Sequence, residues 1–256
     1  LENLGVNFVA LGGLFACCSD INSVTGDAEA SDKGARELMA GFAAFRPKKV
    51  LLGCSTCVYR LNKIFGNFIS QPYDMIGLTQ FLAEKIDQLK FKRLIKKRVT
   101  YQDACKLGRG MGDWESPRAL IQAIPGIEFV EGQHAKDNTI CCGGVSQITR
   151  YKYTKHMNYR RMEEVKALKA DAVVTLDLGC HLALGHLENK YGIEVINLWN
   201  LLGEALGFDY EDKLKKYRLY EDAEKVMAEA KPNLEESHYD LDEVRRFWLK
   251  LMEAGF

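Results

Sequence analysis

Near its middle the chain runs Arg98-Val99-Thr100-Tyr101-Gln102-Asp103-Ala104-Cys105-Lys106-Leu107-Gly108-Arg109. Residues 98–101 have the β-branched and aromatic character of a short strand, and this strand leads directly to a cysteine. Two similar strands are predicted before other cysteines, at 49–53 before Cys54 and at 172–176 before Cys180. Loops at strand ends are held by the sheet yet stay accessible, so this position suits ligands.

Helices are predicted between these strands, over residues 27–45, 56–65, 117–124 and 149–169, with another after Cys180. Further strands are predicted at 127–130 and at 6–11, the latter buried and ended by Gly12-Gly13. The alternation of strands with helices predicts an α/β fold with small, mostly parallel sheets.

The cysteine spacing indicates an internal repeat. Cys17-Cys18 lies 124 residues before Cys141-Cys142, and Cys54 lies 126 residues before Cys180. We therefore predict two related α/β units, at 1–78 and 79–210, and a helical C-terminal extension at 211–256 that contains no cysteine. In the last helix four apolar side chains share one face, which packs on the body of the chain or docks a partner; they are Val244, Phe247, Trp248 and Leu251.

The composition is that of a globular chain that does not need disulfides. Of 256 residues 47% are hydrophobic, and 35 basic side chains balance 35 acidic ones, which argues against a nucleic-acid partner. The longest apolar stretch, 6–18, is shorter than the roughly 20 residues that span a bilayer, and it lacks signal-peptide features. We therefore expect a cytoplasmic chain, where clustered thiols are more often metal ligands or redox groups than disulfides or inert thiols.

The eight cysteines divide into two sets of four, which are Cys17, Cys18, Cys54 and Cys57, and then Cys105, Cys141, Cys142 and Cys180. Thiolate sulfur selects zinc or iron–sulfur clusters. The long gaps and vicinal pairs fit neither paired zinc knuckles nor ferredoxin spacing. Vicinal thiolates can bind different irons of one centre, and Gly143 and Gly144 let backbone amides approach its sulfurs. A multinuclear iron–sulfur centre is therefore favoured over zinc.

These residues resemble the cysteine-rich (CCG) domain family, which includes the catalytic subunit of heterodisulfide reductase and the iron–sulfur subunit of glycolate oxidase. The resemblance covers residues 6–199. It rests on Cys-x35-Cys-Cys-Gly-x36-Cys from Cys105 to Cys180, on the run at 99–109, and on Pro117-Arg118, Ile124-Pro125-Gly126 and Cys141-Cys142-Gly143-Gly144. In heterodisulfide reductase, five-cysteine sets of this kind hold non-cubane 4Fe–4S clusters that cleave a disulfide, so the resemblance implies one or two 4Fe–4S clusters here.

Each set has four thiols where the family pattern has five. In the first unit the leading cysteine would lie upstream of Leu1, and Ser19 follows the pair in place of glycine. In the second unit the last cysteine would fall at Ala183. Four thiolates suffice for a cubane cluster, so cubane and non-cubane types both stay open, as does a unit without a cluster. His181, beside Cys180, is a candidate fifth ligand or a residue of the surroundings.

Two further features have alternative interpretations. Asp103 and Arg109 flank Cys105 and could hold an anionic substrate or form an ion pair that braces the turn. Six basic residues lie between Lys90 and Arg98, and they predict the solvated end of a helix or a docking patch for an acidic redox partner.

The sequence and its resemblance together predict an iron–sulfur subunit of a multisubunit oxidoreductase. Electrons from a ferredoxin-like, flavin or membrane cytochrome subunit would pass through the cluster of the second set to a small disulfide or a sulfur-carrier protein. The cluster itself would be the catalytic group, and the subunit would be cytoplasmic or at the inner face of a membrane complex. The alternatives are a pure electron-transfer subunit, of the glycolate oxidase or quinone-linked type, and a redox-inert scaffold that binds zinc.

Overall fold

Two small parallel sheets organise the chain. The computed structural model describes residues 1–12, 17–66, 68–237 and 239–253. In the first half, β1 (Lys49–Leu52) pairs with β2 (Asp74–Gly77). In the second half β3 (Lys97–Gln102), β4 (Ile127–Phe129), β5 (Ala172–Thr175) and β6 (Glu194–Asn197) form one sheet in the order β4-β3-β5-β6. Every strand pairing in the described residues is parallel, which confirms the predicted α/β class.

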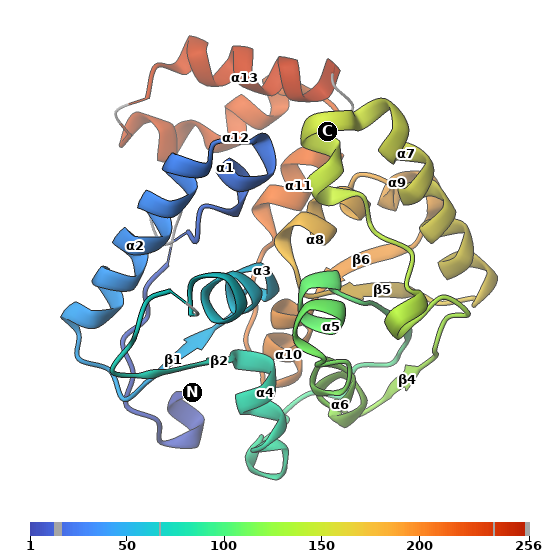
Figure 1. The fold of residues 1–256 in the computed structure, drawn as a ribbon. Helices are drawn as coiled ribbons and strands as arrows, with labels where there is room; N and C mark the ends of the chain where they lie inside the picture. The colour runs from blue at the N-terminus through green and yellow to red at the C-terminus, as the bar shows by residue number, and fades with distance from the viewer. Residues whose placement is uncertain (13–16, 67, 238, 254–256) are drawn as a thin grey trace.

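Helices follow the strands in both halves (Figure 1). The first half contains α1 (Asp20–Thr25), α2 (Ala28–Ala44), α3 (Ser55–Tyr59), the π-helix η2 (Arg60–Phe65) that continues α3, and α4 (Leu78–Ala83). The second contains α5 (Cys105–Met111), α6 (Glu115–Ala123), α7 (Gly144–Ala167), α8 (Leu178–Gly185), α9 (Glu188–Tyr191) and α10 (Leu198–Ala205). Short 3-10 turns lie at η1 (Glu2–Leu4), η3 (Ile86–Gln88) and η4 (Lys136–Asn138). The helices predicted at 27–45, 56–65, 117–124 and 149–169 are confirmed, although α7 begins earlier, directly after the cysteine pair.

Buried apolar side chains from the two halves pack against each other. β5 is buried at all four residues because it lies inside the larger sheet with helices on both faces, as a continuous apolar run predicts. One hydrophobic cluster joins the smaller sheet to the larger one and includes Leu52 of β1, Leu61 of η2, Leu120 of α6 and Leu201 of α10. A second cluster fills the other face of the larger sheet, beneath α7 and α8. The two units therefore share one packed interior.

Two segments differ from the sequence prediction. Residues 6–11 are not a buried strand: they lie outside any helix or strand, and Phe8, Val9 and Leu11 are exposed. A strand needs a hydrogen-bonded neighbour, and no described strand pairs with this apolar run. The basic stretch from Lys90 is also not a helix end. It is a loop leading into β3, held where the amides of Lys92 and Arg93 donate to the Ala205 carbonyl.

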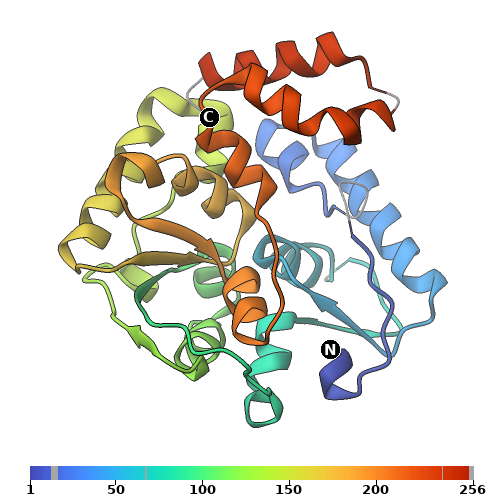
Figure 2. The ribbon, with the colours of Figure 1, turned by 180° about the vertical axis from the view of Figure 1, so that it is seen from behind.

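The C-terminal extension is helical and lies across one end of both halves (Figures 1 and 2). It contains α11 (Lys213–Leu219), α12 (Ala223–Glu235) and α13 (Leu241–Glu253). In α13, Val244 and Trp248 are half-buried, and the Trp248 ring meets Tyr217 of α11 edge-on, at 6.3 Å between centroids. Phe247 is exposed instead of joining that face, and the side chain of Leu251 lies outside the described residues. The apolar stripe thus packs on the body of the chain in part.

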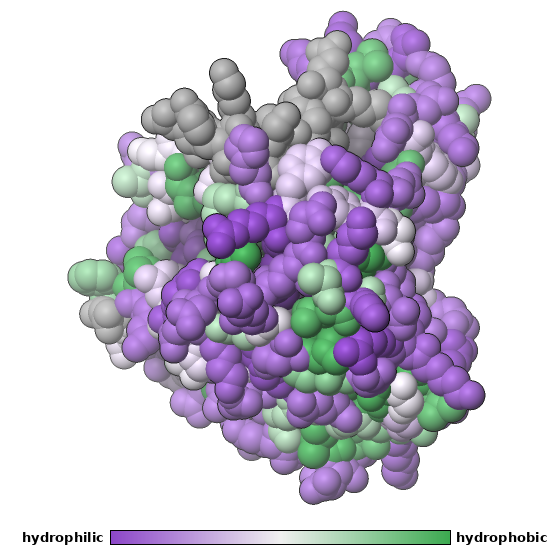
Figure 3. Space-filling model, turned by 90° about the vertical axis from the view of Figure 1, so that its right-hand side faces the viewer, coloured by the Kyte–Doolittle hydropathy of each residue, from purple (hydrophilic) through white to green (hydrophobic). Residues whose placement is uncertain are grey.

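The molecular surface is largely polar on the face that carries α7 and α9. In Figure 3 this face is mainly hydrophilic, with smaller hydrophobic areas separated by polar side chains. No helix in the described part of the chain combines the length and the apolar character needed to cross a bilayer.

Candidate metal centres

The second cysteine set converges at the carboxyl ends of β3 and β5. Cys105 is the first residue of α5, the Cys141-Cys142 pair precedes α7, and Cys180 lies in the first turn of α8. The sulfurs of Cys142 and Cys180 are 2.9 Å apart, and both residues are buried. Cys105 interacts electrostatically with Cys141 and Cys180. The structure therefore brings together the four thiols that the sequence grouped.

The two glycines after the pair shape the wall of this group. Gly143 has a φ of 81°, a left-handed conformation that glycine adopts without strain. The amides of Gly143 and Gly144 each lie 3.4 Å from a cysteine sulfur, those of Cys141 and Cys142. A Cβ on Gly144 would lie 2.4 Å from the Gly179 carbonyl oxygen, so only glycine lets α7 begin this close to α8. Both glycines thus place an amide beside a cysteine sulfur, and Gly144 also leaves room for α8.

Three thiols of the first set form a second group. Cys57 of α3 hydrogen-bonds with Cys18 and with Cys54, the residue that precedes α3. Cys18 is buried, and Cys54 and Cys57 are partly buried. Cys17 is exposed. The structure therefore gathers Cys18, Cys54 and Cys57 and leaves Cys17 at the surface.

The two thiol groups differ in the direction in which the pKa values of their cysteines are shifted. In the first group, hydrogen bonds from Cys57 lower the pKa of Cys18 to about 7 and also lower the pKa of Cys54. In the second group, burial and the neighbouring Cys141 raise the pKa of Cys105, and the hydrogen bond with Cys142 and burial raise that of Cys141. The same hydrogen bonds raise the pKa of Cys57, so two of the three thiols in the first group are nearer to the thiolate form at neutral pH and the third keeps its proton until a metal replaces it.

The strand register defines how the units correspond. Leu52 at the end of β1 pairs with the residue before α4, and Thr175 at the end of β5 pairs with the residue before α10. Leu52 therefore corresponds to Thr175, Cys54 to Asp177, and Cys57 to Cys180. The sequence-based match of Cys54 to Cys180, which placed the missing cysteine at Ala183, is wrong. Ala183 lies in α8 and is fully buried in the second hydrophobic cluster.

Asp177 is a further candidate residue that the cysteine spacing does not indicate. It precedes α8 as Cys54 precedes α3, so an Asp-x-x-Cys stands where the first unit has Cys-x-x-Cys. Its carboxylate accepts hydrogen bonds from the hydroxyls of Ser55 and Thr56 at 2.5 and 2.9 Å, and lies 3.9 Å from the Cys54 sulfur. Alignment of strand ends, instead of cysteines, would have revealed it.

The other predicted candidates have structural roles. His181 is buried between Thr175, at 3.0 Å from Nδ1, and Asp212, at 2.6 Å from Nε2, so both ring nitrogens are occupied and it is not placed as a ligand. Asp103 and Arg109 do not pair with each other. Asp103 accepts two hydrogen bonds from buried Arg118, at 2.7 and 2.9 Å, whereas Arg109 donates to the Asp137 carbonyl at 3.0 Å.

The donor set fits a multinuclear sulfur-bridged cluster. Soft thiolates, backbone amides aimed at sulfur and a glycine cradle are the features that such clusters use. In the residues that the structure describes, no three His, Cys, Asp or Glu side chains are arranged to hold a single metal ion. The thiols that such a cluster could bind are Cys105, Cys141, Cys142 and Cys180 in the second group, and Cys18, Cys54 and Cys57 in the first.

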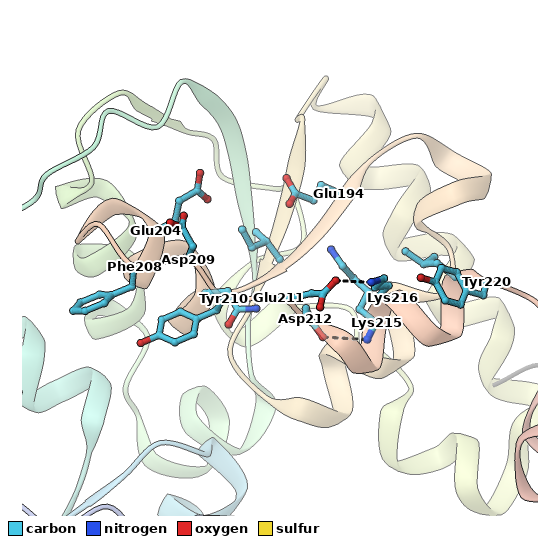
Figure 4. Close-up of a pocket in the computed structure, with 13 residues that line it drawn as sticks. Glu194, Glu204, Phe208, Asp209, Tyr210, Glu211, Asp212, Lys215, Lys216 and Tyr220 are labelled. Carbon is cyan, nitrogen blue, oxygen red and sulfur yellow. Dashed lines mark hydrogen bonds and ion pairs between the residues drawn. The ribbon is translucent and has the colours of Figure 1, made fainter. Parts of the chain in front are cut away.

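A separate pocket opens beside the edge strand β6. Its volume is about 820 Å³, and its lining comes from β6, α10, α11 and the loop that joins these two helices (Figure 4). Among its charged side chains the acidic ones outnumber the basic ones, and Lys215 and Lys216 pair with acidic neighbours. Its lining includes none of the eight cysteines, so it is not the thiol site.

The residues that match a known protein family include the cysteines of both thiol groups. A family model described as "Cysteine-rich domain" (CCG) matches residues 1–62 and 99–185, which contain all eight cysteines. A dihydromethanophenazine:CoB–CoM heterodisulfide reductase subunit from Methanosarcina barkeri is 32% identical over 219 residues, 81% of this chain and 53% of that protein. A fumarate reductase (CoM/CoB) subunit from Methanothermobacter marburgensis is 30% identical over 165 residues, 64% of this chain and 32% of that protein.

A third relative is the probable glycolate oxidase iron–sulfur subunit of Bacillus subtilis, which is 27% identical over 214 residues, 75% of this chain and 46% of that protein. The chain thus spans about half the length, or less, of these relatives, all of which are named as oxidoreductase subunits. With the family model matching more than half of its residues, the chain belongs to the cysteine-rich (CCG) domain family.

Proposed function

We propose that this chain is the iron–sulfur subunit of a multisubunit oxidoreductase and that its second thiol group holds a 4Fe–4S cluster. The observation that carries the proposal is the convergence of four thiols from three strand-to-helix junctions, with two glycine amides beside their sulfurs. The first group holds a second cluster on the same β–Cys–α scaffold, through Cys18, Cys54 and Cys57.

The residues around the second group would determine the charge, the hydrogen bonds and the access of water around a bound cluster. Arg109 and Lys106, both on α5, act electrostatically on Cys105 in the direction that favours its thiolate. The amides of Gly143 and Gly144 can donate to ligand sulfur, which stabilises the reduced, more negative form of a cluster. Burial of Cys142 and Cys180 keeps water from two of the four ligands. A 4Fe–4S cluster at this position supplies one-electron transfer.

We propose a disulfide, or a related sulfur compound, as the final electron acceptor. Reduction of a disulfide consumes two electrons and two protons, breaks the S–S bond and yields two thiols. The electrons would come from a partner subunit of the ferredoxin-like, flavin or membrane cytochrome kind. The similarity to a heterodisulfide reductase subunit over 81% of this chain supports this choice.

The first test measures iron, acid-labile sulfide and zinc in the anaerobically purified chain. Wild type is compared with Cys141→Ser, which removes a ligand of the second group, and Cys57→Ser, which removes the thiol shared by Cys18 and Cys54 in the first. We expect about eight irons in wild type and about four in each variant. Zinc without sulfide would refute the proposal and leave a redox-inert scaffold.

The second test separates disulfide reduction from pure electron transfer. The loaded chain is given a reduced viologen dye as electron donor and a small organic disulfide as acceptor. We expect dye oxidation that depends on the disulfide, yields two thiols per disulfide and is lost in Cys141→Ser. A cluster that accepts electrons from the dye but does not pass them to any disulfide would favour an electron-transfer subunit of the glycolate oxidase type, for which the relative at 27% identity is the precedent.

A further inference from the structure

We propose that Asp177, although it lies in the second unit, is a positioning residue for the metal centre of the first unit. It orients the Cys54-Ser55-Thr56-Cys57 turn, so that the first centre is completed by a side chain from the other half of the molecule. The inference rests on the proposed function, because it assumes that the first thiol group holds a cluster.

The contacts of the carboxylate support this assignment. Oδ2 of Asp177 accepts from the Ser55 and Thr56 hydroxyls at 2.5 and 2.9 Å, and these are the two residues between Cys54 and Cys57. The Cys54 sulfur lies 3.9 Å from the same oxygen. Oδ1 accepts the Gly179 amide at 2.9 Å, which fixes the carboxylate at the start of α8. One oxygen therefore anchors Asp177 in its own helix, and the other holds the first unit's cysteine turn.

A second tether from the same half of the chain holds this turn. The indole Nε1–H of Trp199, on α10, donates to the Gly53 carbonyl at 3.0 Å. Residues 53, 55 and 56 are thus hydrogen-bonded to the second unit on both sides of Cys54. Both Cys54 and Cys57 ligate from this short turn, so its orientation decides whether the two sulfurs face the same centre.

The position of Asp177 in the repeat suggests a rival role as a ligand of the second centre, but its hydrogen bonds argue against that role. Asp177 occupies the position of Cys54 in the first unit, so an oxygen ligand for the second centre is the rival assignment. A carboxylate oxygen has two lone pairs, and both of those on Oδ2 are directed to the Ser55 and Thr56 hydroxyls. Ligation through Oδ2 would break these hydrogen bonds and free the first unit's turn.

The negative charge of Asp177 acts on thiols of both groups, whereas its hydrogen bonds to Ser55 and Thr56 orient the first group alone. Its charge acts electrostatically on Cys54 in the first group and on Cys105 and Cys180 in the second. Loss of the charge should therefore raise the reduction potentials of both centres, since a nearby anion disfavours an added electron. Loss of the hydrogen bonds to Ser55 and Thr56 should disturb the first centre alone. This difference makes the two roles separable.

The experiment uses two parent proteins that each keep one centre. Cys141→Ser keeps the first centre, and Cys57→Ser keeps the second. Into each parent we introduce Asp177→Ala, Asp177→Asn, and the pair Ser55→Ala with Thr56→Val, which removes the donors but leaves the charge. Iron and sulfide per chain, the electron paramagnetic resonance spectrum and the reduction potential are measured for each, with circular dichroism as the check of folding. Asp171→Asn, on an exposed carboxylate at the opposite end of β5, is the control.

In the parent with the first centre we expect Asp177→Ala and the Ser55/Thr56 pair to lose at least half of the iron. Asp177→Asn, which keeps an acceptor oxygen, should restore most of the iron and give a raised potential. In the parent with the second centre, Asp177→Asn, which keeps an acceptor for the Gly179 amide, and the Ser55/Thr56 pair should keep their iron and the shape of the spectrum. Iron loss or an altered spectrum for these variants, without iron loss in the parent that keeps the first centre, would overturn the proposal in favour of an oxygen ligand. Unchanged iron in the first centre would also overturn it. Parents without iron and sulfide would refute the proposed function itself.

Discussion

The two thiol groups are built on the same strand-to-helix junction but differ in what surrounds the sulfurs. After the cysteine pair the first unit has Ser19 and Asp20 where the second has Gly143 and Gly144. At the junction the first unit has Cys54 where the second has Asp177. In the first unit three thiols gather around Cys57, and in the second four thiols gather below a glycine turn. One scaffold thus accommodates two different donor sets.

The comparison shows that close helix packing, more than the cysteines themselves, makes the second group distinctive. Gly144 lets α7 begin against Gly179 of α8. In the first unit the same position holds Asp20, which pairs with Arg60 at 3.3 Å and with Lys106 of the second unit. The first group is therefore held in place by charged and hydrogen-bonded contacts, several of them from the other half, and the second by direct contact of its own backbone segments.

The largest effect is expected from Gly144→Ala. The new Cβ would lie 2.4 Å from the Gly179 carbonyl oxygen, so α7 would have to move away from α8 and separate Cys142 from Cys180. We expect the second centre to lose most of its iron while the first keeps its own, as measured by iron and sulfide per chain. Gly41→Ala in α2, where a Cβ meets nothing within 4 Å, is the matched control and should leave iron unchanged. A fully loaded Gly144→Ala protein would show that close packing does not define the second group.

Arg118→Met should produce the next largest effect, on stability. Arg118 and Asp103 form a two-bond pair whose side chains are 4% and 2% exposed. Removal of the cation leaves a buried carboxylate, which costs about 3–5 kcal/mol in the free energy of unfolding. Arg60→Met should cost less, because Lys106 still neutralises Asp20 in the first unit.

The measurement is urea unfolding of each variant in the same metal-loaded state. Arg93→Met breaks an exposed pair with Asp209 and should change the free energy of unfolding by about 1 kcal/mol or less. If Arg118→Met and Arg60→Met lower the free energy of unfolding equally, the two units do not differ in how they neutralise their buried carboxylates.

Much of the fold could be predicted because its strands are short apolar runs between clear breaks. The strand at 172–176 is recognisable as Ala-Val-Val-Thr-Leu, and its burial on both faces explains why no polar alternation interrupts it. Residues 6–11 have the same apolar character but no strand beside them, and pairing partners cannot be inferred from composition. The predicted strands at 49–53, 98–101, 127–130 and 172–176 all have a neighbour in a sheet, whereas the one at 6–11 has none; β2 and β6, at 74–77 and 194–197, were not predicted.

The sequence predicted which thiols form the candidate sites, but not that a residue of the second unit contacts the cysteine turn of the first. Cysteine spacing alone suggested that Cys54 matches Cys180, whereas strand register matches Cys54 to Asp177. An aspartate carries no signal in a search for sulfur ligands, and its partners Ser55 and Thr56 lie over 120 residues away in sequence. Contacts of this kind between the two units depend on tertiary packing, which the spacing of cysteines does not encode.

A smaller effect should appear in thiol reactivity of the metal-free, reduced protein. Cys54 and Cys105 are both partly buried, but hydrogen bonding with Cys57 lowers the pKa of Cys54, whereas burial raises that of Cys105. At pH 7 we expect iodoacetamide to modify Cys54 several-fold faster, because the thiolate is the reactive form. The difference should narrow as the pH rises above about 9, where ordinary thiols are ionised.

Peptide mass spectrometry at intervals after alkylation gives both rates from one sample. Cys57→Ala removes the hydrogen bond to Cys54 and should slow its modification at pH 7 without affecting Cys105. Equal rates at Cys54 and Cys105 across this pH range would show that the two thiol groups do not differ in how they hold protons.

The smallest effect concerns the residue after each cysteine pair. Ser19 has a φ of 56°, the same left-handed region as Gly143 at 81°, so the first unit keeps this turn with a residue that has a Cβ. Ser19→Gly should raise the free energy of unfolding by about 1 kcal/mol or less, because relief of the left-handed strain is partly offset by the greater chain entropy of glycine. Gly143→Ser should lower it by a similar amount.

A double-mutant cycle with Gly34 of α2 separates backbone strain from packing. A Cβ on Gly34 would lie 1.9 Å from the Ser19 hydroxyl oxygen, so Gly34→Ala should destabilise the wild type. With Ser19→Gly present that clash is gone, and Gly34→Ala should become neutral or stabilising, since alanine favours the helix. We expect a coupling of about 1–2 kcal/mol from urea unfolding of the four proteins. Additive effects would mean that the Ser19 side chain turns away from α2, and that the turns after the two cysteine pairs differ only in backbone strain.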